Sequence, residues 1–253
     1  MSGKTKIEMK GLEKSFGDNK VLRGVNLDIR EGDITVIIGR SGEGKSVLLK
    51  HVIGLLRPDQ GKVRIDGEDI SALRGADLNQ VRAKFGMLFQ GAALFDSMTV
   101  GENVAFPLRE HTKLSNAEIA ERVREKLYLV GLDGIEDRMP SQLSGGMQKR
   151  VGLARAIVRE PEILLYDEPT TGLDPILSDS IDRLIVHMEQ SIDITSVVIS
   201  HDIKSALKYA HSVAMLHEGK IIVHGTPQEI LVEENPVVRQ FIAGSSEGPI
   251  QVV

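Results

Sequence analysis

The feature that most constrains the fold of this chain is a glycine-rich segment, from Gly39 to Ser46, that fits the pattern G-x-x-x-x-G-K-[ST]. An apolar, β-branched run lies directly before it at 34–38, and a segment with helical periodicity follows at 45–53. A strand, a glycine-rich loop and a helix in this order are typical of a loop that holds phosphate groups. The sequence therefore predicts an α/β fold built around a phosphate-binding loop.

The chemistry of this loop suits a nucleotide. Its glycines let the backbone turn tightly and point N–H groups at a phosphate, and the helix N-terminus adds about half a positive charge. We expect Lys45 to reach the β- and γ-phosphates, and the Ser46 hydroxyl to be a ligand of Mg²⁺. The alternative is an incidental Lys-Ser after a turn, which the flanking strand and helix disfavour. The residues expected to bind the nucleotide are Gly39, Arg40, Ser41, Gly42, Glu43, Gly44, Lys45, Ser46 and Val47.

Two adjacent carboxylates, Asp167 and Glu168, end a second apolar run at 163–166. A run that is apolar on both faces suits the centre of a parallel sheet. Because side chains alternate along a strand, the two carboxylates should point to different places. We expect Asp167 to approach Mg²⁺ through water and Glu168 to be the general base for the attacking water. Such a pair alone is more typical of a solvated loop, but the phosphate loop favours the catalytic interpretation.

A third motif, Leu143-Ser144-Gly145-Gly146-Met147, precedes an apolar-periodic segment that predicts a helix to Val158. It offers a hydroxyl, bare backbone N–H groups and the positive end of a helix dipole, which together make an anion site. Nothing in the chain supplies a separate nucleotide for this site. The motif is therefore expected to cap a nucleotide that a second copy of the chain holds.

These three motifs together resemble those of ABC ATPases, and the resemblance covers nearly the whole chain. It implies ATP and Mg²⁺ as ligands, and a P-loop NTPase core with an antiparallel β-subdomain and an inserted helical subdomain. It also implies a head-to-tail homodimer, in which Ser144, Gly145 and Gly146 contact the ATP of the partner.

Four more residues match positions of the ABC family in the expected order. The resemblance implies that Phe16 stacks on adenine, although the family more often has Tyr there, and that His201 contacts the γ-phosphate. Gln90 matches the glutamine that contacts Mg²⁺ and the attacking water. Asp174 matches the aspartate that crosses the dimer interface, but Thr-Gly stands before Leu173 where many members have Ser-Ala. The implied Mg²⁺ ligands are Ser46, Gln90 and Asp167, and the implied catalytic residues are Glu168, His201 and Gln90.

Four segments, at 42–50, 89–100, 102–110 and 235–241, are similar to the ATPase of Mla-type phospholipid transporters. This similarity implies a phospholipid cargo, an integral membrane permease, a STAS-domain subunit, an MCE lipid-binding protein and a place on the cytoplasmic face of the inner membrane. Six apolar residues are expected to form a groove for a short permease helix, unless they are the core of the helical subdomain. They are Ala92, Ala93, Leu94, Phe95, Met98 and Phe106.

Two other functions stay open: an ABC ATPase for another solute, and a soluble ABC ATPase that acts on DNA or ribosomes. The second needs a long coiled-coil insertion or two cassettes, and the sequence has neither. The formal net charge of −5 argues against nucleic-acid binding. No cysteine marks an oxidising compartment or a thiolate metal site. No apolar run reaches about 18 residues, so we expect a cytoplasmic protein that does not span a membrane.

The 253 residues suggest a single nucleotide-binding domain at 1–244, with the helical subdomain at about 91–156, followed by a C-terminal tail at 245–253. Short strands are predicted within 6–36 and at 62–65, and a hairpin around Glu218-Gly219. Capping boxes predict helices that begin after Ser115 and Thr226. A short helix is expected from Asn235 to a stop at Gly244. The tail, with apolar Ile250, Val252 and Val253, is expected to lie on the partner subunit.

Overall fold

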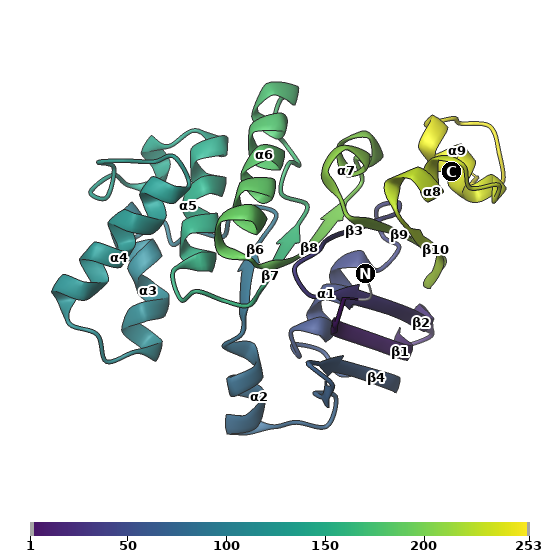
Figure 1. Cartoon of the computed structure of the whole chain (residues 1–253), viewed down its shortest axis with the longest axis horizontal. Coiled ribbons are helices and arrows are strands. Elements are labelled where there is room, and N and C mark those ends of the chain that lie inside the picture. The colour runs from purple at the N-terminus through teal and green to yellow at the C-terminus, as the bar shows by residue number, and fades with distance from the viewer. Residues whose placement is uncertain (1–2, 252–253) are drawn as a thin grey trace. The chain divides into compact units, whose positions relative to one another are not determined.

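The computed structural model describes residues 3–251, which divide into two compact units. The first unit contains the chain up to Arg82 and again from Thr195 onward, and the second runs from Ala83 to Ile194. Figure 1 labels the elements of both units. The phosphate loop belongs to the first unit, whereas the Asp167-Glu168 pair belongs to the second.

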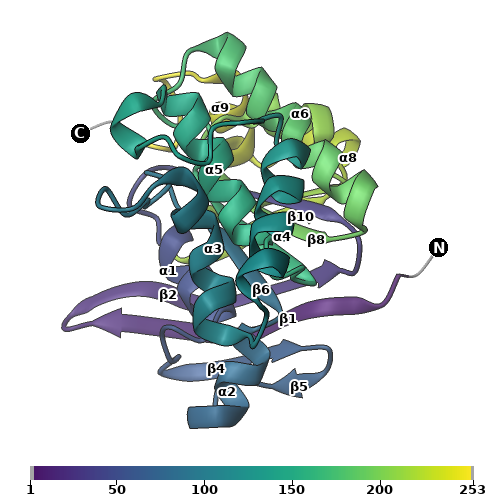
Figure 2. The ribbon, with the colours of Figure 1, turned by 90° about the vertical axis from the view of Figure 1, so that its left-hand side faces the viewer.

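An antiparallel sheet in the first unit has the strand order β2-β1-β4-β5. Its two main strands run side by side with β4 next to β1 (Figure 2). They are twelve residues long, so the expectation of short strands is wrong here. The pairing of β1 with β2 shifts register between Met9 and Leu12. Gly11, with a φ of 59°, lies in this β-bulge. The strands are β1 (Thr5–Phe16), β2 (Asn19–Arg30), β4 (Gln60–Ile65) and β5 (Glu68–Asp69).

The first unit also contains parallel strands that carry the phosphate loop. The strand β3 (Ile34–Ile38) lies between β8 (Thr195–Ser200) and β9 (Ser212–His217) and pairs parallel with both. Every residue of β3 and β8 is buried, as expected for strands covered on both faces. The predicted hairpin is confirmed, because β10 (Lys220–Gly225) pairs antiparallel with β9. The helices of this unit are α1 (Lys45–Val52), α2 (Gly75–Arg82), α7 (Ile203–Tyr209), α8 (Pro227–Leu231) and α9 (Pro236–Ala243).

The second unit has two parallel strands and most of the long helices. The strands β6 (Phe85–Leu88) and β7 (Ile163–Asp167) pair in register. The predicted helical stretch after Gln90 is present as α3 and α4, which contact each other and α5 (Figure 2). The helices are α3 (Val100–His111), α4 (Asn116–Leu129), α5 (Gly145–Ile157) and α6 (Pro175–Ile192), with a 3-10 turn, η1 (Pro140–Gln142).

Both predicted capping boxes are confirmed. The Ser115 hydroxyl accepts a hydrogen bond from the Glu118 N–H, and the Glu118 carboxylate accepts one from the Ser115 N–H. Thr226 and Glu229 make the same reciprocal pair at the start of α8. These pairs satisfy N–H groups that a helix start otherwise leaves free, so the sequence locates both helix starts.

The C-terminal tail folds back onto its own helix α9. Gln240 Nε2 donates to the carbonyl oxygens of Ser245 and Ile250, and Gln240 Oε1 accepts from the Ile250 N–H at 2.6 Å. Ile250 is consequently 7% exposed. The segment 245–251 thus contacts its own chain, because one side-chain amide satisfies both backbone groups of Ile250. The expected contact of the tail with a partner stays a prediction. Val252 and Val253 lie outside the described residues.

Candidate functional site

The phosphate loop joins β3 to α1, and its glycines have backbone conformations that other residues rarely adopt. Gly39, Gly42 and Gly44 have φ values of 154°, 84° and 97°. A Cβ on Gly39 would lie 2.4 Å from the carbonyl oxygen of Leu216 on β9. The close approach of these two backbones therefore excludes any side chain at Gly39.

Lys45 lies inside the loop. Its residue is 4% exposed, and its Nζ donates to the carbonyl oxygens of Gly39 and Arg40, each at 2.8 Å. The helix α1 starts at this residue, and its first turn contains no acidic side chain. Gly44 provides no side-chain cap for the first N–H groups of α1. A lysine ammonium and the N–H groups at a helix start form a donor set that fits a phosphate anion.

The acidic residue of the loop, Glu43, points away from Lys45 and the start of α1, towards the end of β9. Its Oε1 lies 3.2 Å from Nδ1 of His217, and its Oε2 accepts a hydrogen bond from the Glu218 N–H at 2.6 Å. His217 is the last residue of β9, and Glu218 begins the turn to β10. The carboxylate is therefore bound at the start of that turn, although the sequence predicts that Glu43 contacts the nucleotide.

Two more of the predicted residues lie in the first unit and are open to solvent. Phe16, at the end of β1, is 47% exposed, and Nζ of Lys14 lies 5.6 Å from the centre of its ring. This exposure shows that Phe16 is not a core residue. His201 is exposed directly after β8, and the next residue, Asp202, caps α7 by accepting from the Ser205 N–H.

In the second unit, Asp167 and Glu168 are separated by a change of backbone conformation, and not by the alternation of side chains along a strand. Asp167 is the last residue of β7, but Glu168 has a φ of 49° and so leaves the strand in a left-handed conformation. Glu168 Oε2 accepts from the Thr171 hydroxyl at 2.9 Å and lies 3.4 Å from Nε2 of Gln90. The unit thus brings Gln90 and Glu168 together, as their expected shared task requires.

Lys149 also belongs to this site, although no sequence motif indicates it, because it holds the Gln90 backbone. This residue of α5 is 6% exposed, and its Nζ donates to the Gln90 carbonyl at 2.9 Å. Burial lowers the pKa of Lys149, while the charge of Glu168 acts in the opposite direction. Lys149 lies one helical turn after Gly145, and this spacing was the only signal that it faces the site.

The residues after Gln90 are strained and held by an arginine. Ala92 and Ala93 have φ values of 58° and 49°. Arg155 of α5 donates to the carbonyl oxygens of both alanines, at 2.6 and 2.7 Å. Such conformations cost about 1–3 kcal/mol each and persist only where neighbours hold them. The guanidinium therefore stabilises a conformation that the sequence of the segment does not favour.

Of the six apolar residues expected to form a permease groove, five are exposed or half-buried and one is buried. Ala92 is buried, whereas the Phe95 ring packs on Phe106 at a centroid distance of 5.0 Å and stays 42% exposed. The fully buried Asn103 fixes the loop between them, since its side chain bonds both backbone groups of Phe95 and the carbonyl of Met98. Ala92 is thus a core residue, whereas the docking role of the other five stays a prediction.

The third motif begins α5 as predicted, with Ser144 as its N-cap, and the helix ends at Ile157, one residue before the predicted end. Asp174 similarly caps α6, since its Oδ1 accepts from the N–H groups of Ile176 and Leu177. A Cβ on Gly146 would touch Leu177 at 3.4 Å, so the starts of the two helices are close. Ile176 is 82% and Leu177 38% exposed. Two exposed aliphatic side chains therefore lie beside the motif.

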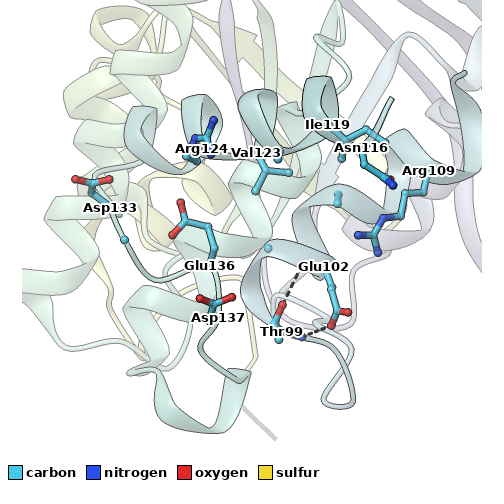
Figure 3. Close-up of a pocket in the computed structure, with 14 residues that line it drawn as sticks. Thr99, Glu102, Arg109, Asn116, Ile119, Val123, Arg124, Asp133, Glu136 and Asp137 are labelled. Atoms are coloured by element: carbon cyan, nitrogen blue, oxygen red, sulfur yellow. Dashed lines mark hydrogen bonds between the residues drawn. The ribbon is translucent and has the colours of Figure 1, made fainter. Parts of the chain in front are cut away.

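A cavity of about 670 Å³ opens between α3, α4 and the loop at 133–137. Figure 3 shows Asp133, Glu136 and Asp137 gathered at one side and Arg109 at the other. Its remaining lining residues are Thr99, Gly101, Glu102, Ala105, Asn116, Ile119, Ala120, Val123, Arg124 and Gly134. The cavity is thus partly apolar and has an uneven rim of charges.

Residues 22–171 match the family model described as ABC transporter. The chain belongs to the ABC transporter family. As an ABC ATPase it binds and hydrolyses ATP, and its fold is that of the ABC cassettes. A relative in Mycobacterium leprae, named a probable ribonucleotide transport ATP-binding protein, is 47% identical over 96% of this chain and 70% of its own length.

Two further proteins extend the comparison. The Haemophilus influenzae protein named intermembrane phospholipid transport system ATP-binding protein MlaF is 43% identical to this ABC ATPase over 97% of the chain and 93% of its own length. The ATP-binding cassette MJ0796, solved as a dimer in a post-hydrolysis state with ADP and phosphate, is 33% identical. It superimposes with a TM-score of 0.80 over 87% of this chain and 98% of its own.

The contact between Lys149 and Gln90 gives the first prediction. Lys149→Met keeps a long side chain but leaves the Gln90 carbonyl without its donor, at a cost of about 1–3 kcal/mol. Because Gln90 then loses its fixed orientation, we expect kcat for ATP hydrolysis to fall about tenfold, while the Kd for ATP changes less than about twofold. Lys113→Met, at an exposed position, is the matched control. An equal loss of binding and turnover would contradict this role for Lys149.

Proposed function

We propose that ATP hydrolysis by this ABC ATPase drives the movement of phospholipid between membranes through a partner permease. The observation that carries the proposal is the 43% identity to the phospholipid-transport relative, which extends over almost the full length of both chains. Ribonucleotide transport is the second candidate, because a relative of that name is 47% identical. The two candidates share the ATPase and differ only in cargo.

The first unit would hold the nucleotide. The N–H groups of the glycine loop and the Lys45 ammonium would bind the phosphates, and the exposed Phe16 ring would stack on adenine. His201 would contact the γ-phosphate. Ser46 would supply a hydroxyl ligand to Mg²⁺, Gln90 would supply an oxygen ligand, and Asp167 would act through water. Mg²⁺ would neutralise charge that develops on the phosphates.

The second unit would supply the general base. Glu168 would accept a proton from the water whose oxygen attacks the γ-phosphorus, as the bond to the ADP oxygen breaks. Thr171 and Gln90 both hydrogen-bond the same carboxylate oxygen of Glu168, at 2.9 and 3.4 Å, which supports a fixed orientation for this group. The products would be ADP and phosphate.

Two copies would form the working ATPase. Ser144, Gly145 and Gly146 would cap the ATP of the partner, and Asp174 would lie at the interface between copies. The exposed Ile176 and Leu177 beside this motif support the proposal, because a second copy would remove them from water. The dimeric state of the similar cassette MJ0796 also supports it.

The permease would dock in the cavity between α3 and α4. A short helix would place apolar side chains on Ala105, Ile119 and Val123, and a basic residue near the acidic side of the rim. The complex would act at the cytoplasmic face of the inner membrane, with a STAS-domain subunit and an MCE lipid-binding protein as further partners. Between residues 3 and 251, no helix is long and apolar enough to cross a membrane.

Replacing the general base gives the second prediction. Glu168→Gln removes the proton acceptor but keeps the shape of the side chain, so phosphate release should fall by about 10²-fold or more. The Kd for ATP should change little, and the ATP-bound dimer should accumulate in size-exclusion chromatography with light scattering. Glu121→Gln, an exposed residue of α4, is the control. If nucleotide binding fell in parallel with turnover, Glu168 would be structural.

The third prediction concerns the permease. Ala120→Trp would fill the cavity from an exposed position on α4, so the ATPase should fold and bind ATP but no longer co-purify with its permease. Ala117→Trp, the same change one turn earlier and outside the cavity lining, should leave the complex intact. Phe95→Asp tests the surface that the sequence suggests. Loss of the complex with Phe95→Asp but not with Ala120→Trp would move the docking site there.

The cargo itself is the fourth prediction. The complex, purified through the tagged ATPase from detergent-solubilised membranes, should carry phospholipid that mass spectrometry identifies. The Ala120→Trp variant, which should lose the permease, measures carry-over. Phospholipid vesicles should also stimulate ATP hydrolysis by the complex at least twofold. Stimulation by ribonucleotides with no enrichment of phospholipid would favour the second candidate.

A further inference from the structure

The phosphate loop contains a carboxylate, and this is an unfavourable residue for a loop that binds an anion. Glu43 stands between Gly42 and Gly44, two residues before Lys45. At neutral pH its charge has the same sign as the phosphates of ATP. Like charges at short distance weaken binding, and they do so most in a partly buried site, where water screens them poorly. The loop therefore needs a means to restrain this charge.

The end of β9 and the turn to β10 supply two donors to the carboxylate. The His217 ring nitrogen Nδ1 lies 3.2 Å from Glu43 Oε1, and the Glu218 N–H donates to Oε2 at 2.6 Å. The side chains of His217 and Glu43 are 17% and 14% exposed. Each oxygen of the carboxylate thus has a donor, in a place that is largely shielded from solvent.

The turn is itself fixed, so it holds Glu43 rather than following it. Glu218 and Gly219 have φ values of 46° and 76°, which direct the Glu218 N–H at the loop. The Gly219 carbonyl accepts from the Arg23 N–H of β2 at 2.8 Å. A Cβ on Gly219 would lie 2.6 Å from the Val21 carbonyl oxygen, so β2 and the turn are in close backbone contact. The position of the two donors is therefore set by the sheet and not by the nucleotide loop.

We propose that His217 is a positioning residue for ATP binding, which acts by holding the Glu43 carboxylate on the β9–β10 turn. The proposal rests on ATP binding at the phosphate loop. Without the His217 ring, the Glu218 N–H is the one remaining partner of the carboxylate that the structure shows among residues 3–251, so its charge can turn towards the phosphates more easily. His217 acts on the charge of Glu43, and it touches neither the substrate nor the reacting atoms.

This role differs from simple support of the hairpin, because it depends on a charge. His217→Ala should raise the Kd and the KM for ATP about three- to tenfold, the scale of one partly shielded charge near the phosphates. The value of kcat should change less than about twofold, because the bound state reacts with the same groups. The loss should be larger for ATP than for ADP, absent for adenosine, and smaller at high salt.

A double-mutant cycle tests the proposal. In a Glu43→Gln background, which has no charge to restrain, His217→Ala should change the Kd for ATP by less than about 1.5-fold. The cycle is measured by equilibrium titration of the purified full chain with ATP, with thermal unfolding to establish that each variant folds. His187→Ala, an exposed histidine of α6, is the matched control. If His217→Ala does not fold, His217→Gln takes its place in the same cycle.

Two results would overturn the proposal. An equal loss of ATP affinity in both backgrounds would show that His217 supports the hairpin independently of Glu43. A fall in kcat with an unchanged Kd would show that it acts on the reaction. The separate question of whether ATP binds at the loop is decided by Lys45→Ala. If this variant kept full affinity, the site itself would be wrong, whatever the outcome of the cycle.

Discussion

The structure of the first unit depends on one close approach of two backbones, between Gly39 and the Leu216 carbonyl of β9. A Cβ at Gly39 would lie 2.4 Å from that oxygen, so β3 can end beside β9 only with a glycine. This contact fixes where the loop leaves the sheet. The buried Lys45, bonded to the carbonyls of Gly39 and Arg40, then closes the loop around its own ammonium group. A loop of this form can present N–H groups and a cation together to a phosphate.

In the second unit, the polar groups Gln90 and Glu168 lie beyond the ends of their strands, so other contacts must hold them in position. Glu168 has left β7 in a left-handed conformation, and Gln90 lies beyond the end of β6. The helix α5 compensates for this, because Lys149 bonds the Gln90 carbonyl and Arg155 bonds those of Ala92 and Ala93. The helix that begins with the Ser144 motif thus also holds the Gln90 segment. A displacement of α5 would consequently move the Gln90 backbone as well.

Local signals in the sequence predicted much of this correctly, and non-local contacts account for the rest. The capping boxes at Ser115 and Thr226 and the glycine loop are patterns of neighbouring residues, so their chemistry is visible in the chain. The conformation of Glu168 and the contact of Lys149 with Gln90 depend on groups far away in sequence. Alternation along a strand predicts that Asp167 and Glu168 point apart, but the actual cause is the left-handed backbone at Glu168. The sequence also did not indicate that Gln240 binds Ile250 within the same chain, because this contact depends on how the tail folds back onto α9.

The phosphate loop illustrates how far such non-local contacts reach. Its motif is complete within eight residues, yet Leu216 limits Gly39, and His217 and Glu218 bind Glu43. Arg40 of the loop also donates to the carbonyl oxygen of Gln251, at 3.2 Å. All of these partners follow the loop by more than 170 residues. The motif therefore specifies that a phosphate can bind, whereas the last strands and the tail specify the charge and the geometry that the phosphate meets.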